Sequence, residues 1–185
     1  HFPDVTLVGI LDVDQGLFGA DYRAAERMAQ LLTQVSGRAG RAEKPGRVVV
    51  QTRHPDHPLI HTLVRNGYGA FALEALQERA AALLPPYSYQ VLVRAEATVD
   101  RMPRNFLDDA VELGQAMGDG SIEFWGPVPA PMERRAGSFR AHLLVQSNSR
   151  GELQRLLAEW LPRMRGLKSA RRVRWSVDVD PQEML

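Results

Sequence analysis

The sequence predicts a protein of mixed class in two parts: an α/β segment of strand, helix and strand, then an α+β unit of four strands and two helices. Three observations support this fold class. Short β-branched apolar runs alternate with amphipathic helical stretches along the chain. Glycine- and proline-containing pairs mark the ends of these stretches, as expected for turns. The Pro85-Pro86 pair ends a helical stretch and separates the two parts.

The first part is expected to contain a parallel sheet. Its predicted strand, helix and strand occupy residues 5–11, 24–32 and 47–52. The first strand is a nearly unbroken apolar run, which is typical of a strand buried on both faces. Gly16 and Asp21 indicate a loop before the helix, with Asp21 placed to cap it. A second helix is predicted to begin near Pro58 and to end at Asn66-Gly67.

The second part begins after an alanine-rich helix at residues 71–83. In chain order we expect a strand, a helix, two strands, a helix and a strand, at residues 88–98, 103–117, 122–125, 139–146, 151–163 and 172–179. A proline-rich loop is predicted over residues 126–131. This βαββαβ order is that of the ferredoxin-like, split βαβ fold. The expected domain limits are 1–68 for the first part, 69–86 for the connecting helix and proline boundary, and 87–185 for the C-terminal domain.

The composition is ordinary for a globular protein and excludes some classes. Apolar residues make up 44% of the 185 residues, enough for a core, and charged residues make up 24%. No apolar run reaches the roughly 18 residues of a membrane span, and the first residues do not resemble a signal peptide. The lack of cysteine excludes disulfides and cysteine-ligated zinc within this sequence. Because the chain begins with His instead of Met, we expect a piece of a longer protein.

The stretch with the most specific chemistry is the motif Q-x-x-G-R-x-x-R at residues 34–41. Gly37 and Gly40 let the backbone turn and approach a ligand, and Arg38 and Arg41 offer guanidinium groups that bind phosphate oxygens. Such an arrangement suits an arginine finger, which neutralises charge on a transferring phosphoryl group. The alternative is a helix C-cap followed by a solvated basic turn, and spacing alone favours it.

This motif resembles motif VI of superfamily 2 helicases, and other segments extend the resemblance. H-F-P at residues 1–3 resembles the tail of motif V. D-Y-R-A-A-E-R (21–27), L-P-P-Y (84–87), G-P-V-P-A-P (126–131) and D-V-D-P (178–181) resemble segments of the primosomal protein N′ (PriA) family of replication-restart helicases. The resemblance covers essentially the whole chain. It implies that the first part is the end of the second RecA-like lobe of a P-loop helicase.

The resemblance implies a parent enzyme that uses ATP to move 3′→5′ on DNA, recognises stalled or branched forks and starts primosome assembly in the bacterial cytoplasm, at the nucleoid. Arg41 would be the finger facing the γ-phosphate, with Gln34, Gly37 and Arg38 on the same nucleotide-binding surface. ATP and Mg²⁺ would be cofactors of the parent, and zinc would belong to its upstream cysteine-rich module. The sequence contains no G-x-x-x-x-G-K-[ST] loop or Walker B pair, so the fragment should not hydrolyse ATP alone. The alternative is a non-enzymatic module that binds branched DNA and an acidic peptide.

Basic residues gather in the second part although the net charge is only +1. We expect DNA contacts from Arg134, Arg135, Arg140, Lys168, Arg171, Arg172 and Arg174. Basic groups offset phosphate charge, and the indoles of Trp160 and Trp175 have faces that can stack on unpaired bases. The alternative is that both tryptophans are core residues and that the bases lie on a solvated surface.

Arg150 and Gln154 are four residues apart at the start of a predicted helix, so they share one face near its positive end. A carboxylate would be favoured there. The sequence alone favours the alternative, a helix N-terminus with exposed polar residues. The resemblance implies that they hold the acidic C-terminal tail of single-stranded DNA-binding protein, and that other primosome proteins are further partners.

Two further groups suggest metal or acid–base chemistry at first sight. His54, His57 and His61 are interrupted by prolines and lack a carboxylate cluster, so we expect them to shape a loop and predict no metal site. The carboxylate pairs Asp12/Asp14 and Asp178/Asp180 lie at predicted strand ends. Turn and cap roles suit that position better than catalysis.

Overall fold

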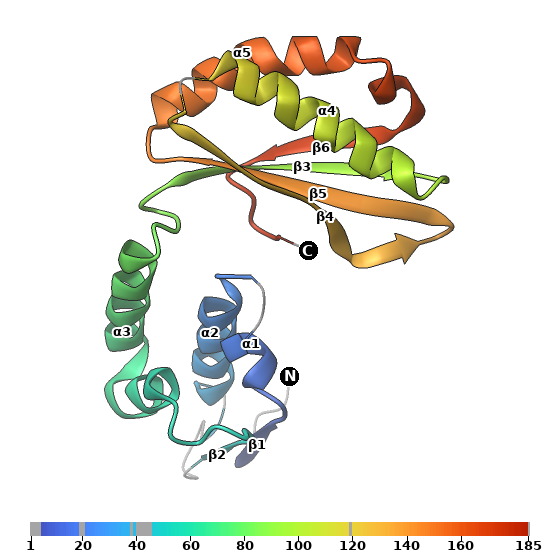
Figure 1. Ribbon diagram of the computed structural model, residues 1–185. Helices are drawn as coiled ribbons and strands as arrows, with labels where there is room; N and C mark the ends of the chain where they lie inside the picture. The colour runs from blue at the N-terminus through green and yellow to red at the C-terminus, as the bar shows by residue number, and fades with distance from the viewer. Residues whose placement is uncertain (1–4, 19–20, 38, 40–45, 119, 185) are drawn as a thin grey trace. The chain divides into compact units, whose positions relative to one another are not determined.

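The fold is described from a computed structural model of the chain, which describes residues 5–18, 21–37, 39, 46–118 and 120–184. The chain divides into two compact units, His1–Ala82 and Leu83–Leu185, each with its own core. Figure 1 shows the elements of both units. No helix among the described residues is long and apolar enough to cross a membrane.

The first unit contains a two-stranded parallel sheet of β1 (Leu7–Ile10) and β2 (Arg47–Val50). Its helices are α1 (Asp14–Phe18), α2 (Ala24–Ser36) and α3 (Pro58–Ala81). The prediction that the first strand is buried on both faces was wrong for this structure, because Leu7 is 63% exposed. The two described strands pack one side against the helices, through Ile10 and Val50.

The structure differs from the predicted loop before α2. Residues 14–18 form α1, and the N-cap of α2 is Arg23 instead of Asp21. Asp21 is buried two residues earlier, where its carboxylate accepts hydrogen bonds from the Arg23 N–H (2.9 Å) and from the Arg27 guanidinium. The carboxylate therefore still lies near the positive end of the helix, where a negative charge is stabilising.

Helix α3 is two helical segments joined at Gly67. Gly67 has φ 81° and ψ 179°, outside the helical region and accessible mainly to glycine. The end predicted at Asn66-Gly67 and the further helix from residue 71 correspond to these two segments. At the start of α3, the His57 ring nitrogen Nδ1 accepts a hydrogen bond from the Leu59 N–H at 3.3 Å.

The second unit follows the predicted order of strands and helices. Its elements are β3 (Tyr89–Ala97), α4 (Arg101–Met117), β4 (Ile122–Arg135), β5 (Ser138–Ser147), α5 (Arg150–Gly166), the 3₁₀ turn η1 (Ser169–Arg172) and β6 (Arg174–Val179). The strands form one sheet in the order β4-β5-β3-β6, with every neighbouring pair antiparallel. Both α4 and α5 lie on the same face of this sheet (Figure 1).

The proline-rich loop predicted over residues 126–131 was wrong, because these residues continue β4. The strand runs on to Arg135, with register shifts between Trp125 and Val128 and between Pro129 and Arg134. β4 lies at the edge of the sheet, where a proline without an N–H is tolerated because it need not complete a ladder on both sides.

The core of the second unit lies between the sheet and the two helices. Trp160 of α5 is fully buried, and its indole N–H donates to the Ala110 carbonyl of α4 at 2.9 Å. Phe124 meets the Trp160 ring edge-on at 5.8 Å between centroids. Gly114 leaves the space that the Phe124 ring occupies: a Cβ there would lie 2.5 Å from the ring. The two helices thus interlock with β4 through close contacts.

Candidate nucleic-acid and partner-binding site

The predicted phosphate-binding motif lies at the end of α2. Gln34 is exposed in the last turn, and Gly37 is the C-cap, with its N–H bonded to the Thr33 carbonyl at 3.1 Å. Arg38, Gly40 and Arg41 lie outside the described residues. The nucleotide-binding roles of Gln34, Gly37, Arg38 and Arg41 therefore stay predictions.

The three histidines near the start of α3 have structural contacts. The Phe18 ring packs against His54 and His57, with centroids 4.6 and 5.7 Å apart. His57 also caps α3, and His61 lies 3.8 Å from the exposed Asp56 carboxylate. Among the described residues, no group of three or more histidines and carboxylates is arranged to hold a metal ion. These contacts fit the predicted loop-shaping role.

The carboxylate pairs also make local contacts. Asp14 accepts hydrogen bonds from the Thr52 hydroxyl and from the Arg53 N–H (3.0 Å), which join α1 to the chain after β2. The hydrogen bond from Thr52, followed by that from the Arg53 backbone, lowers the pKa of the Asp14 carboxyl. Asp178 forms an ion pair with Arg94 at 3.0 Å. Both residues act in the structure as partners for nearby donors.

Four of the predicted DNA-binding residues lie at one end of the larger sheet. Arg134 and Arg135 pair with Phe139 and Ser138 beside the β4–β5 turn, and both arginines are exposed. Arg140 and Arg174 follow on β5 and β6, and they line a hollow of about 300 Å³ together with Arg94. Arg94 was not predicted, because its partners Asp178 and Glu183 lie 84 and 89 residues further along the chain.

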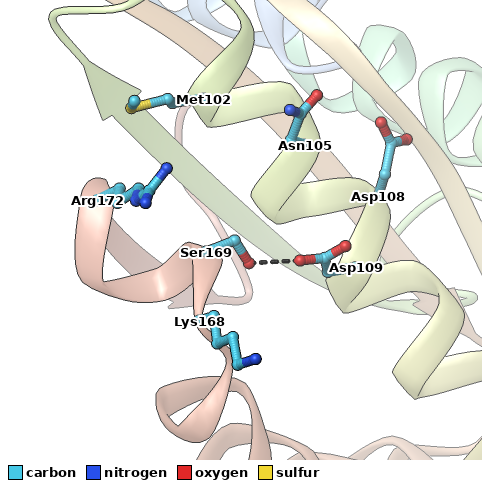
Figure 2. Close-up of a pocket in the computed structure, with 7 residues that line it drawn as sticks. All are labelled: Met102, Asn105, Asp108, Asp109, Lys168, Ser169 and Arg172. Carbon is cyan, nitrogen blue, oxygen red and sulfur yellow. Dashed lines mark hydrogen bonds between the residues drawn. The ribbon is translucent and has the colours of Figure 1, made fainter.

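The other three bases lie around η1. Arg171 is exposed. A second pocket of about 510 Å³ is lined by Met102, Asn105, Asp108, Asp109, Lys168, Ser169 and Arg172 (Figure 2). The Ser169 hydroxyl donates to the Asp109 carboxylate across it. Because Asp108 and Asp109 face Lys168 and Arg172 across this pocket, it attracts phosphate less than the arginine-lined hollow does.

Trp160 is a core residue, which confirms the alternative given for it from the sequence. Its side chain is fully buried, whereas Trp175 is half-buried and packs against the core on Phe106, with ring centroids 5.4 Å apart. Trp125, on the edge strand β4, is 59% exposed. Sequence reasoning missed Trp125 because it falls beside the segment predicted as a proline-rich loop.

His142 is a buried residue on β5 that was also not predicted. It is 4% exposed, and its Nε2 is one of the buried polar atoms without a hydrogen-bond partner in the described part of the chain. Burial, and then the positive charges of Arg94 and Arg140, lower the pKa of His142 to about 4. The imidazole is therefore neutral at physiological pH.

Arg150 and Gln154 are both exposed in the first turns of α5. Ser149 caps this helix, and its hydroxyl accepts a hydrogen bond from the Glu152 N–H at 3.3 Å. The spacing of four residues places the two side chains on one helix face. A guanidinium and an amide are thus available near the N-terminus of α5.

By fold, the protein is a two-sheet α/β protein whose larger unit exposes clustered basic side chains. A model of the primosomal protein N C-terminal domain family matches residues 80–182, and the chain belongs to this family.

Similar proteins are found in distant bacteria. The chain is 46% identical over 184 residues to replication restart protein PriA of Haemophilus influenzae, covering 100% of this chain and 25% of the relative. It is 40% identical over 142 residues to that of Synechocystis sp., covering 77% of this chain and 17% of the relative. It is 33% identical over 184 residues to that of Bacillus subtilis, covering 100% and 23%. The chain thus spans a quarter or less of the length of these relatives.

Proposed function

We propose that this chain is the C-terminal part of an ATP-dependent 3′→5′ DNA helicase that recognises stalled or branched replication forks and initiates primosome assembly. The observation that carries the proposal is the family match, together with whole-chain similarity to proteins named for replication restart. In this proposal, residues 1–68 form the end of the second RecA-like lobe, and residues 69–86 are the helix and proline pair that connect it to the next domain. Residues 87–185 form a ferredoxin-like domain. The observed βαββαβ order supports the last assignment. The protein would work in the bacterial cytoplasm, at forks in the nucleoid.

The proposal gives the chain one half of an ATPase site. Arg41 is the finger that neutralises charge on the γ-phosphate, and Arg38, Gly37 and Gln34 belong to the same nucleotide-binding surface. The remaining half, with the phosphate loop and the Mg²⁺ ligands, lies elsewhere in the parent, as does the zinc module. Since the sequence has no phosphate-binding loop, the fragment alone does not hydrolyse ATP.

The second unit would bind branched and single-stranded DNA through its basic residues. The best-supported contacts are Arg140 and Arg174, because they converge with Arg94 on one hollow. Arg134 and Arg135 extend this basic end of the sheet. Lys168, Arg171 and Arg172 form a separate set around η1. A module that only binds DNA and a peptide is the alternative, and the lack of a phosphate-binding loop in this chain is what favours it.

The proposed partner site is Arg150 and Gln154, which would bind the acidic C-terminal tail of single-stranded DNA-binding protein. A planar guanidinium holds a carboxylate with two donors, whereas a lysine at this position keeps only the charge. We expect Arg150→Lys to weaken binding of an acidic C-terminal peptide by about 1 kcal/mol or more, as for hydrogen bonds to charged groups. Gln154→Ala should cost less, because a neutral hydrogen bond is worth about 0.5–1.5 kcal/mol.

Peptide affinity is measured by fluorescence anisotropy beside forked-DNA affinity on the same preparations. Arg163→Lys is the matched control, since Arg163 is exposed near the other end of α5. Forked DNA should bind all variants normally if the peptide site is separate. Wild-type peptide affinity in Arg150→Ala would remove this site from the proposal, and failure of the chain to bind forked DNA would remove its DNA-binding role.

A further inference from the structure

The face of the larger sheet turned away from α4 and α5 carries charged residues at neighbouring positions. Odd-numbered residues of β3 and β5 pack in the core under the helices, so the even-numbered residues occupy this second face. The strand register places Arg94 beside His142. It also places Glu96 between Arg140 of β5 and Arg174 of β6. Residues from three strands therefore meet at this end of the face.

The balance of charge there is positive. Arg174 lies 3.4 Å from Glu96 and is 88% exposed, and Arg94 pairs with Asp178 at 3.0 Å. Arg140 has no ion pair within the described part of the chain. In the hollow itself, three guanidinium groups stand against the carboxylate of Glu96. Arg140 also borders another pocket, together with Asp100 and Glu133. An exposed guanidinium such as that of Arg174 can exchange its surface ion pair for a phosphate at small cost, because such pairs contribute little.

An aromatic side chain occupies the same face at a distance from these arginines. Trp125 pairs with Leu144 of β5, which is an even-numbered position four residues from Arg140, or about 13 Å along the strand. The indole N–H donates to the Glu123 carboxylate at 3.0 Å, which orients the ring. An exposed indole about 13 Å from a basic hollow on the same sheet face offers both the stacking and the phosphate contacts that bind single-stranded nucleic acid.

The end of the chain covers the middle of this face. After β6 it turns back along the side of the sheet opposite the helices (Figure 1). The Asp180 N–H donates to the Gln90 carbonyl at 2.9 Å, Pro181 is buried, and Arg94 donates to the Glu183 carbonyl at 2.8 Å. We call residues 180–184 the C-terminal strap. The strap is fixed at Gln90 and Arg94 of β3, while Trp125 and Arg174 are left exposed on the outer strands.

Buried polar atoms without partners gather on this face. Among the described residues they are Ser88 Oγ, Gln90 Oε1 and His142 Nε2. Gln90 and His142 occupy even-numbered positions of β3 and β5, and Ser88 continues the same alternation one residue before β3. Leaving a buried donor or acceptor unpaired is unfavourable, but these three atoms are enclosed and do not themselves contact a ligand on the surface of this face.

We infer that this sheet face binds a single strand of nucleic acid, with phosphates at Arg140 and Arg174 and a base stacked on Trp125 beside the C-terminal strap. The inference rests on the proposed DNA-binding function and specifies where the unpaired strand lies. The inference assigns Arg140 and Arg174 to the binding face and leaves out Lys168 and Arg171, which lie elsewhere.

The test is an anisotropy titration of the 185-residue chain with a fluorescein-labelled oligothymidylate at several salt concentrations. The double variant Arg140→Gln/Arg174→Gln should weaken binding on the order of tenfold and lower the log–log salt slope by about 1.4, for two lost contacts to a single strand. The control Arg163→Gln/Arg165→Gln, at exposed positions of α5 outside the proposed DNA contacts, removes the same charge and should cost less than about threefold. An equal loss in both double variants would overturn the inference.

Stacking has its own readout. Trp125→Leu should weaken oligothymidylate binding at least about fivefold, because base–aromatic stacking contributes that much or more. Trp125→Phe should retain most of the affinity but lose most of the quenching of tryptophan fluorescence that accompanies binding, since Trp160 is fully buried and Trp175 is half-buried against Phe106. Unchanged affinity in Trp125→Leu, with a wild-type urea midpoint, would refute the site.

Forked duplex DNA is titrated with the same proteins. If the wild-type chain binds forked DNA but not the oligothymidylate, the sheet-face inference fails and the proposed function stands. If it binds neither, both fail.

Discussion

His142 should make the second unit lose stability as the pH falls below neutrality. The side chain is 4% exposed, and its pKa in the folded protein is about 4, against 6.5 for an ordinary histidine. Burial and the neighbouring Arg94 and Arg140 oppose its protonation. Well above pH 6.5 the residue is neutral in both the folded and the unfolded state and has no pH-dependent effect on stability.

Between these two pKa values the unfolded chain binds a proton that the folded chain does not. Folding stability therefore falls as the pH drops through this window. The difference between the two pKa values lowers the free energy of unfolding by about 3 kcal/mol once the pH is well below 4, and by about 2 kcal/mol at pH 5. A histidine stabilised by a carboxylate would have the opposite effect, because its protonation would raise the folding stability as the pH falls.

Urea unfolding followed by tryptophan fluorescence measures this effect, because Trp125, Trp160 and Trp175 all lie in the second unit. We compare the free energy of unfolding at pH 7 and pH 5 for wild type and for His142→Gln, which cannot titrate. The variant should lose about 2 kcal/mol less over this interval. If the two proteins lose the same free energy to within about 0.5 kcal/mol, the stated protonation of His142 is wrong.

Four further outcomes are expected. Gly114→Ala should destabilise by about 1–3 kcal/mol in urea unfolding, because overpacking against Phe124 outweighs the better helix propensity. Gly151→Ala, where a Cβ meets open space in α5, should be neutral or stabilising. Ser149→Ala should cost about 1 kcal/mol by the same assay, through loss of the cap of α5. In the full-length parent, Arg41→Ala should keep ATP binding and lower DNA-stimulated hydrolysis by about 10³-fold or more, and a steady-state rate within about twofold of wild type would contradict the finger role.

The sequence predicted most elements, because their signals are local. The helix break at Gly67 and the order of strands and helices in the second unit both follow from nearby residues. The course of β4 through its prolines was not predictable in this way. Its conformation depends on its position at the edge of the sheet, which is a property of the whole fold.

The sequence predicted several residues of the candidate surfaces from their type, but it did not predict which of them lie together. Arg140 and Arg172 look alike in the sequence, but Arg140 lines a hollow with Arg94 of the neighbouring strand, whereas Arg172 lines a pocket with Lys168 and Asp109. Trp175 looked like a stacking group and Trp125 did not, because burial depends on which face of the sheet a residue occupies. Such contacts between distant residues carry no local sequence signal.

The prolines of β4 also affect how the molecule meets other chains. Pro127, Pro129 and Pro131 stand at alternate positions of an outer strand that is interrupted by two register shifts. Prolines and irregular pairing on an outer strand hinder another strand from aligning there, which protects a protein from edge-to-edge aggregation. At this edge, copies of the protein should therefore remain separate at high concentration, and an extended peptide has to bind through side chains instead of extending the sheet.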